Sequence, residues 1–234
     1  ENKNAIVADG GVVTLTAKGL DEVLRTVVNN TGEIRAQTIA NRQGEIYLLG
    51  GMEKDRVEVG GRLDASAPVV GDGGFIETSA ASVKLNGGRV TTQATKGQAG
   101  LWLIDPNDYK VAASGGDITG AQLGADLATS NVTISTATQG TAGGNGDIFV
   151  NDNVTWSSGN TLTLNAQRNI RINATLDASG GSGGAVTLNY GLATVASGNT
   201  AYYDFGLSTS GFAGRINLKP GPNFSTKLGS NGTT

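Results

Sequence analysis

The side chains that could do acid–base or metal chemistry in this chain are carboxylates, because its 234 residues include no histidine and no cysteine. A Ser-His-Asp triad, a Cys-His dyad and a zinc–thiolate site are therefore excluded. Two pairs of aspartates lie close together in the sequence, Asp105 with Asp108 and Asp147 with Asp152. Carboxylates about 5–9 Å apart can hydrolyse a glycosidic bond, and acidic clusters can bind calcium. The elements that position these aspartates decide whether either chemistry is available.

Turn formation is the alternative role for the same aspartates, and it is the one we favour. Asp and Asn side chains accept hydrogen bonds from nearby backbone N–H groups at turns. The stretch Gly143–Asp147 is similar to a calcium-binding nonapeptide repeat, but it has no tandem copy. We therefore nominate no catalytic, cofactor-binding or metal-binding residue. We expect no cofactor and predict that the chain is not an enzyme.

The elements that carry these side chains are short alternating runs. Apolar residues recur at every second position in Ile46–Leu48, Val57–Val59, Leu162–Leu164 and many similar stretches. This period is typical of strands with one buried and one wet face. Gly-Gly pairs such as Gly50-Gly51 separate the runs, and glycine permits the positive φ that corners between strands require. The pattern predicts an all-β solenoid of short strands over residues 1–234, taken as a single segment.

The composition agrees with a narrow aliphatic interior. Hydrophobic residues make up 38% of the chain and aromatic residues only 5%. A β-sandwich is the alternative fold, but its strands would be longer and richer in aromatics. The net charge is −3, so we expect no nucleic-acid partner. No run approaches the roughly 20 apolar residues of a membrane-spanning helix.

Two kinds of internal repetition support the solenoid. Thr31–Arg35 and Gln43–Tyr47 share a Gly-Glu-Ile core, and Arg62–Ser66 echoes Thr175–Ser179. Each member of the second pair precedes a glycine-rich loop and another alternating run. At roughly 20 residues per coil the chain would form about 11 or 12 coils and a rod of roughly 55 Å. The open strand edges at its two ends would need caps, continuation or a neighbouring subunit.

Three stretches depart from this pattern. Leu20–Val28 and Ala121–Leu127 place apolar residues at helical spacing, and we expect a short helical insertion at each. Tyr202–Phe205, together with Phe212, forms the one aromatic cluster. We interpret this cluster as packing against the solenoid, and a patch for a partner is the alternative.

Several longer sequence segments resemble the filamentous-haemagglutinin type of two-partner-secretion exoprotein, a family of large bacterial adhesins. The most specific is Trp102–Tyr109, and the others include Gly10–Ala17, Asn41–Gly51, Gly71–Ser79 and Gly221–Gly229. The resemblance covers nearly the whole chain. It implies a right-handed parallel β-helix, export through a dedicated outer-membrane pore and a role in adhesion or surface filaments. The Asn-Pro-Asn motifs of the family's N-terminal secretion domain are absent, and Asp105–Asp108 is a different motif. We therefore expect the segment to lie beyond most of that domain.

The function expected from these observations is a structural or adhesive segment of a secreted exoprotein on the surface of a Gram-negative bacterium. We expect the chain to be an excerpt of a longer protein. Its expected partners are the secretion pore during export, a host-cell, matrix or glycan ligand that the sequence does not identify, and further copies through end-to-end self-association. The alternatives are a β-helical polysaccharide-degrading enzyme and a self-assembling extracellular fibre subunit.

Overall fold

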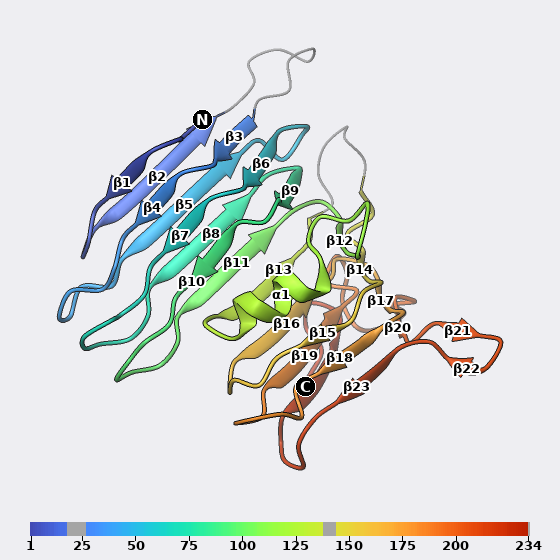
Figure 1. Cartoon of the computed structure of the whole chain (residues 1–234). Coiled ribbons are helices and arrows are strands. Elements are labelled where there is room, and N and C mark those ends of the chain that lie inside the picture. Colours follow the sequence, from blue (N-terminus) through green and yellow to red (C-terminus); the bar gives the residue numbers. More distant parts are fainter. Residues whose placement is uncertain (18–26, 138–143, 234) are drawn as a thin grey trace. The chain divides into compact units, whose positions relative to one another are not determined.

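A computed structural model of the chain describes residues 1–17, 27–137 and 144–233 (Figure 1). Over these residues the fold is nearly all-β, with one α-helix and sheets whose strands pair in parallel except in one hairpin. The all-β prediction is thus confirmed. The described chain divides into two compact units: unit 1 holds residues 1–17, 27–106 and 129–132, and unit 2 holds residues 107–128, 133–137 and 144–233. The prediction of one solenoid segment over residues 1–234 stays a prediction.

Unit 1 contains three parallel sheets, and the chain visits them in rotation (Figure 1). After one strand in each sheet, the chain returns to the first sheet and adds the next strand there. The first sheet consists of β1 (Ala5–Val7), β4 (Glu33–Arg35), β7 (Arg62–Asp64) and β10 (Arg89–Thr91). The second consists of β2 (Val12–Ala17), β5 (Glu45–Gly50), β8 (Phe75–Ser79) and β11 (Leu101–Asp105), and the third of β3 (Val27–Asn30), β6 (Arg56–Val59) and β9 (Ser82–Leu85).

Each turn of the chain in unit 1 is longer than the sequence pattern suggested. Ala5 pairs with Glu33 and Glu45 with Phe75, separations of 28 and 30 positions. The prediction of roughly 20 residues per coil is therefore wrong for this unit. The reason lies in the connections, since β4 ends at Arg35 and β5 begins only at Glu45. Such loops add residues without adding strand.

The interior of unit 1 is built from columns of inward-facing side chains. Ile46, Ile76 and Trp102 pair in register on β5, β8 and β11, and all three are fully buried. The Trp102 indole N–H donates to the Thr78 hydroxyl of the neighbouring column at 3.1 Å, so its polar group is satisfied. Apolar burial of this kind stabilises a fold by about 25 cal/mol per Å². Stacked aliphatic columns therefore hold successive turns together.

A column of glycines marks one corner of these turns. Gly44, Gly74 and Gly100 directly precede β5, β8 and β11. A Cβ atom on Gly74 would lie 2.0 Å from the carbonyl oxygen of Gly44, and one on Gly100 would lie 1.9 Å from that of Gly74. None of the three has a positive φ. Close approach of successive backbones, and not the unusual φ expected from the sequence, requires glycine here.

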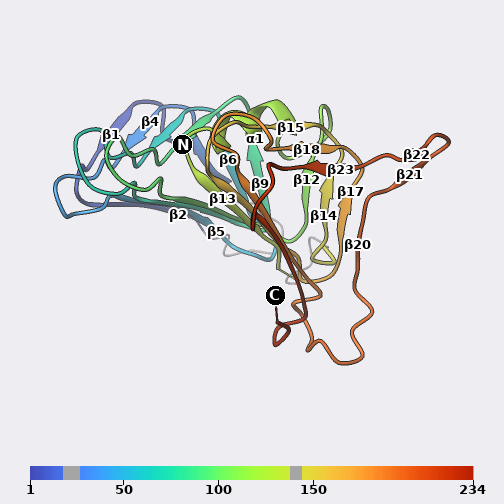
Figure 2. The same cartoon turned by 90° about the horizontal axis from the view of Figure 1, so that it is seen from below.

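Unit 2 repeats the parallel pairing with three further sets of strands, and β13 (Asn131–Ser135) falls across the division between the units. One set consists of β12 (Tyr109–Val111), β14 (Ile148–Val150), β17 (Ile170–Ile172) and β20 (Tyr203–Asp204). The others are β15 (Val154–Thr155), β18 (Thr175–Asp177) and β23 (Arg215–Asn217), and β16 (Thr161–Asn165), β19 (Ala185–Tyr190) and β24 (Phe224–Leu228). An antiparallel hairpin of β21 (Leu207–Ser208) and β22 (Gly211–Phe212) projects away from the other strands of unit 2 (Figures 1 and 2).

One of the two expected helical insertions is confirmed. Helix α1 (Gly120–Leu127) begins after Thr119, whose hydroxyl accepts a hydrogen bond from the backbone N–H of Gln122 at 3.2 Å. It lies beside β15, and its Leu123 and Leu127 side chains are fully buried. Of the other predicted helix, residues 20–26 lie outside the described residues. Val27 and Val28 begin β3 instead, where pairing with β6 overrides their helical spacing.

The longer sequence echo marks the same local structure in the two units. The Asp64 carboxylate accepts the backbone N–H of Ser66 at 2.9 Å, and the Asp177 carboxylate accepts that of Ser179 at 3.0 Å. Each turn leads from one sheet towards the next, as the repeat predicted. The shorter repeat of Thr31–Arg35 and Gln43–Tyr47 also marks one local structure, because in each member a glycine directly precedes a strand and the isoleucine is fully buried, although the strands β4 and β5 belong to different sheets.

Candidate functional site

The outward side of three neighbouring strands in unit 1 carries a group of acidic and aromatic side chains. Residues at alternate positions of β5, β8 and β11 point away from the buried columns, because successive side chains of a strand face opposite ways. In register they form three rows of three. We call these nine residues the acidic face: Glu45, Phe75 and Leu101; Tyr47, Glu77 and Leu103; Leu49, Ser79 and Asp105.

Hydrogen bonds and ring contacts fix much of the acidic face in place. The Tyr47 hydroxyl donates to the Glu45 carboxylate at 2.6 Å, and the Ser79 hydroxyl donates to the Glu77 carboxylate at 2.7 Å. The ring of Tyr47 lies 5.7 Å from that of Phe75 between centroids, tilted by 53°. Such tilted aromatic pairs are favourable beyond their buried area. The face is therefore ordered before any ligand arrives.

The electrostatics of the acidic face are unusual for an exterior surface. Burial, followed by the charge of Glu77, raises the pKa of Asp105 to about 6. The hydrogen bond to Glu45, with burial and the negative charges of Glu45 and Glu77, raises the pKa of Tyr47 to about 12. The nine residues include three carboxylates and no lysine or arginine. Among the described residues, neither a donor nor a cation offsets the charge of Asp105.

The acidic face can contact a ligand in two ways. Ionised carboxylates only accept hydrogen bonds, so they suit hydroxyl or ammonium groups. The rings of Tyr47 and Phe75 offer flat apolar surface and can also attract a cation. Clusters of side chains with perturbed pKa values concentrate at functional sites, although ion-pair networks also produce them. Here no ion pair is present within the nine residues.

Two of the four aspartates considered from the sequence accept hydrogen bonds from backbone N–H groups, as predicted, but the bonds run to segments more than 30 positions away instead of to their own turns. The Asp108 carboxylate accepts the backbone N–H groups of Asn145 and Asp147 at 2.9 and 2.8 Å, which fixes the described part of the glycine-rich stretch at 143–147. The Asp152 carboxylate accepts the backbone N–H of Gly120 at 2.8 Å, at the first residue of α1.

Asp147 combines turn formation with an ion pair. Two N–H groups of the Arg168 guanidinium, Nε at 2.8 Å and one terminal nitrogen, donate to its carboxylate, and the backbone N–H of Asn169 adds a bond of 3.1 Å. Burial alone would raise the pKa of Asp147, but these hydrogen bonds and the charge of Arg168 lower it below its ordinary value. A carboxylate held in this way has its charge neutralised within unit 2.

Asp105 is the exception among the four, because it lies on the acidic face instead of in a turn. The sequence grouped it with Asp108, whereas the structure brings it near Glu77. The alternation of β5 and β8 already indicated that Tyr47 and Glu77 face outward. The sequence alone does not give the register between strands, and it is this register that places outward-facing residues of different strands side by side. Across the described residues, no group of three or more acidic side chains is arranged to hold a metal ion.

The sequence offered two roles for the aromatic cluster of unit 2, packing or a patch for a partner, and the residues of the cluster differ in which role they fit. The ring of Tyr203 packs edge-on against Tyr190 and Phe205, with centroids 5.3 and 6.0 Å away. Packing is therefore confirmed for this part. Phe212, at the end of the hairpin, is 72% exposed, so the packing interpretation is wrong for that residue.

Comparison of the chain with protein-family models, with curated proteins and with solved structures finds no match in any of the three. No helix in the described part of the chain has the length and apolar character needed to span a membrane.

Proposed function

We propose that this chain is an adhesive segment of a secreted bacterial surface exoprotein of the filamentous-haemagglutinin type, and that it binds its ligand through the acidic face and neighbouring loops. In this proposal each unit is a right-handed parallel β-helix. The rotation of the chain through three parallel sheets supports a helical path, and parallel strand crossovers are right-handed in about 98% of cases. Export through an outer-membrane pore to the surface of a Gram-negative cell belongs to the same proposal.

The observation that carries the binding role is the composition of the acidic face. Three carboxylates and two aromatic rings occupy in-register positions on strands, without a cation among them. Sites built on strands are held more rigidly than sites on loops. A purely structural surface gains nothing from a half-buried carboxylate such as Asp105, whose charge is not compensated.

The chemistry of the face selects a class of ligand. Hydroxyl groups of a neutral sugar, or the ammonium group of an amino sugar, can donate to Glu45, Glu77 and Asp105. The apolar side of a sugar ring can lie on Tyr47 or Phe75. Sulfated or carboxylated glycans would be repelled by the three negative charges. We therefore propose a neutral or amino-sugar glycan as the ligand.

The test is glycan-array and cell-binding measurement with two variants and a matched control. Tyr47→Ala removes the ring and Glu77→Gln removes one charge, and each should weaken binding about 10-fold or more. Thr163→Ala alters the equivalent outward position of β16 in unit 2 and should bind as the unaltered chain does. Absence of binding to any glycan or cell by the unaltered chain would contradict the adhesive role.

One observation favours a second candidate, an enzyme that acts on polysaccharide. An acid whose pKa is raised to about 6, near a second carboxyl group, is the pattern of a glycosidase acid and its partner. Asp105 and Glu77 would take these roles. Release of reducing ends from a bound glycan, abolished in Asp105→Asn, would establish this candidate. Binding without any release would leave adhesion as the function.

A further inference from the structure

Two neighbouring loops of unit 1 carry exposed aliphatic side chains. Three loops of this unit connect β4 to β5, β7 to β8 and β10 to β11, and they comprise residues 36–44, 65–74 and 92–100 (Figure 1). Ile39 in the first loop is 55% exposed, and Val69 and Val70 in the second loop are 71% and 50% exposed. We call these three side chains the aliphatic patch.

Hydrogen bonds hold the three loops against one another. The backbone N–H of Thr38 donates to the Ser66 carbonyl at 2.8 Å, and the Thr38 hydroxyl donates to the Asp72 carbonyl at 2.9 Å. The backbone N–H of Ala67 donates to the Gln93 carbonyl at 2.8 Å. The two loops that carry the aliphatic patch therefore lie side by side, and the third loop lies beside the second.

Turns of the chain lie on both sides of the aliphatic patch. The Gly10 N–H donates to the Gln37 carbonyl at 2.7 Å, so the preceding turn is in place, and the third loop belongs to the following turn. Pro68, Val69 and Val70 are nevertheless three consecutive exposed apolar residues. Their exposure does not arise at the end of a sheet. A surface without a partner gains nothing from such a run, so it marks a contact site.

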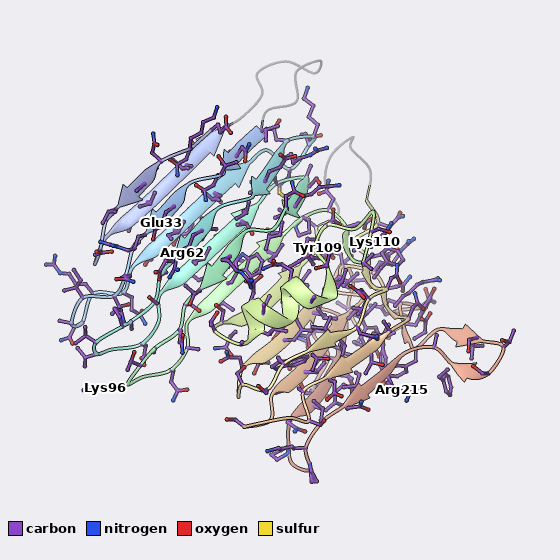
Figure 3. The ribbon with its side chains drawn as sticks, in the orientation of Figure 1. Glu33, Arg62, Lys96, Tyr109, Lys110 and Arg215 are labelled. Atoms are coloured by element: carbon purple, nitrogen blue, oxygen red, sulfur yellow. The ribbon has the colours of Figure 1, made fainter. Side chains whose placement is uncertain are left out.

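Two cations accompany the aliphatic patch. Arg42 in the first loop and Lys96 in the third are both exposed, and Figure 3 labels Lys96 at the far end of its loop. Among the described residues neither forms an ion pair. Asp72 is the one acidic residue of the three loops, and its carboxylate accepts the backbone N–H of Gln98 at 2.8 Å. The loops are therefore net positive, although the whole chain has a net charge of −3.

The composition of the three loops selects the kind of partner. The side chains of the aliphatic patch contain only apolar atoms, so their partner needs no directional hydrogen bonds. The boundary between the headgroups and acyl chains of a bilayer meets this requirement, and cations beside the patch can contact anionic headgroups. Protein interfaces usually centre on aromatic side chains, and the three loops contain none. A lipid surface is therefore favoured over a protein partner.

We propose that the aliphatic patch docks onto the surface of a lipid bilayer that contains anionic lipids. Ile39, Val69 and Val70 enter the boundary between headgroups and acyl chains, while Arg42 and Lys96 contact the headgroups. Three aliphatic side chains and two cations bury little area and neutralise little charge, so the association is weak and reversible. It is independent of glycan binding by the acidic face.

Co-sedimentation with vesicles of phosphatidylcholine, with and without phosphatidylserine, tests the proposal. The unaltered chain should bind better when phosphatidylserine is present, and added salt should weaken this binding. Val69→Asp combined with Val70→Asp should weaken it at least about 10-fold, and Arg42→Gln combined with Lys96→Gln should do so to a similar extent. Val195→Asp, at an exposed valine of unit 2, is the control and should bind as the unaltered chain does. Circular dichroism checks that every variant folds.

A fluorescent label locates the contact without a charge change. The chain has no cysteine, so Val69→Cys can carry a single environment-sensitive dye. Its emission should shift to the blue when vesicles containing phosphatidylserine are added, whereas the same dye on Val195→Cys should not respond.

Several outcomes would overturn the proposal. They are no binding to any vesicle, which would leave the aliphatic patch to a protein partner, equal binding with and without phosphatidylserine, undiminished binding by the Val69→Asp and Val70→Asp double variant, and no response of the dye at position 69. Glycan binding by that double variant should be unchanged, and Tyr47→Ala should still bind vesicles. Failure here and failure of the adhesive role are therefore separable.

Discussion

The acidic face of unit 1 and the outward side of β16 and β19 in unit 2 rest on the same kind of strand but carry different chemistry. On the unit 2 strands the outward residues are Thr161, Thr163, Asn165, Ala185, Thr187 and Asn189, which we call the hydroxyl–amide face. It has no charge and no aromatic ring. The Asn189 side-chain amide donates to the side-chain oxygen of Asn165 at 2.8 Å, and the Thr187 hydroxyl lies 3.1 Å from that of Ser225 on β24.

The difference indicates what each surface is for. On the hydroxyl–amide face, polar side chains bond to their equivalents on the next strand, and the bonds tie successive strands together. On the acidic face, the hydrogen bonds of Tyr47 and Ser79 run to residues of their own strands, and Asp105 has a raised pKa with no compensating cation among the described residues. Polar groups left available on an ordered surface are those that a ligand can use.

The largest expected effect tests what the two faces share, which is their interior. Leu48 beneath the acidic face and Leu164 beneath the hydroxyl–amide face are both fully buried. Leu48→Ala and Leu164→Ala should each lower the free energy of unfolding by ~2–5 kcal/mol, through lost burial and a cavity. Urea unfolding followed by circular dichroism measures this, with the exposed Val69→Ala as control. A cost below ~1 kcal/mol at one site alone would show that the interiors differ.

The next largest effects on the free energy of unfolding compare Asp147, whose charge is neutralised by Arg168, with Asp105, whose charge is not compensated. In unit 2, Asp147→Asn removes the charge that Arg168 and the Asn169 N–H stabilise, and should cost ~1–2 kcal/mol at neutral pH after allowance for screening of the half-exposed Arg168. The pKa of Asp147 is lowered, so its contribution is present above the ordinary aspartate pKa and is lost as the pH falls through the folded value. Thermal unfolding of both proteins at neutral and acid pH checks this. A cost that does not shrink in acid would contradict the ion-pair explanation.

Asp105 on the acidic face should behave in the opposite sense. Its pKa is raised from 3.8 to about 6, so between these values the folded state holds a proton that the unfolded state has released. Stability therefore falls as the pH rises through this window. Asp105→Asn should flatten the dependence and stabilise the protein by ~1 kcal/mol at mildly alkaline pH, a value reduced for solvent screening. The melting temperature of both proteins from about pH 4 to pH 8 provides the measurement. Parallel curves would disprove the assignment.

The smallest effect is expected on the hydroxyl–amide face. Thr187→Val removes the contact with Ser225 but keeps a β-branched residue, so stability should change by no more than ~0.5 kcal/mol. Glycan binding should not change at all. A clear loss of glycan binding in this variant would mean that both faces bind, and the comparison between them would lose its meaning.

Much of the local structure could be predicted from the sequence. Alternation in Ile46–Leu48 and Leu162–Leu164 placed the leucines and isoleucines inward, and the structure buries them. The Leu-Asp-Ala-Ser phrases predicted equivalent turns, and the helical spacing of Ala121–Leu127 predicted α1. These features depend on residues close together in the chain, where side-chain periodicity and turn chemistry are sufficient.

The acidic face could not be predicted, because it depends on register between strands about 30 positions apart. Register follows from the lengths of the intervening loops, and the loops of unit 1 differ in length and share little sequence beyond the glycine that directly precedes β5, β8 and β11. A shift of one residue would turn Glu77 and Asp105 inward. The raised pKa of Asp105 depends on the same register, since its causes are burial among neighbours and the charge of Glu77.

The glycine column has an evolutionary consequence. Gly44 and Gly74 occupy the same corner of successive turns, and each directly precedes a strand of the same sheet. Deleting residues 45–74 would join Gly44 to Phe75 and leave a glycine, a strand and an unchanged alternation of inward and outward residues. Duplication of the same stretch would be equally compatible with the fold. The gene can therefore lengthen or shorten by whole turns in a single recombination step, whereas insertion of one residue within a strand would reverse its two faces.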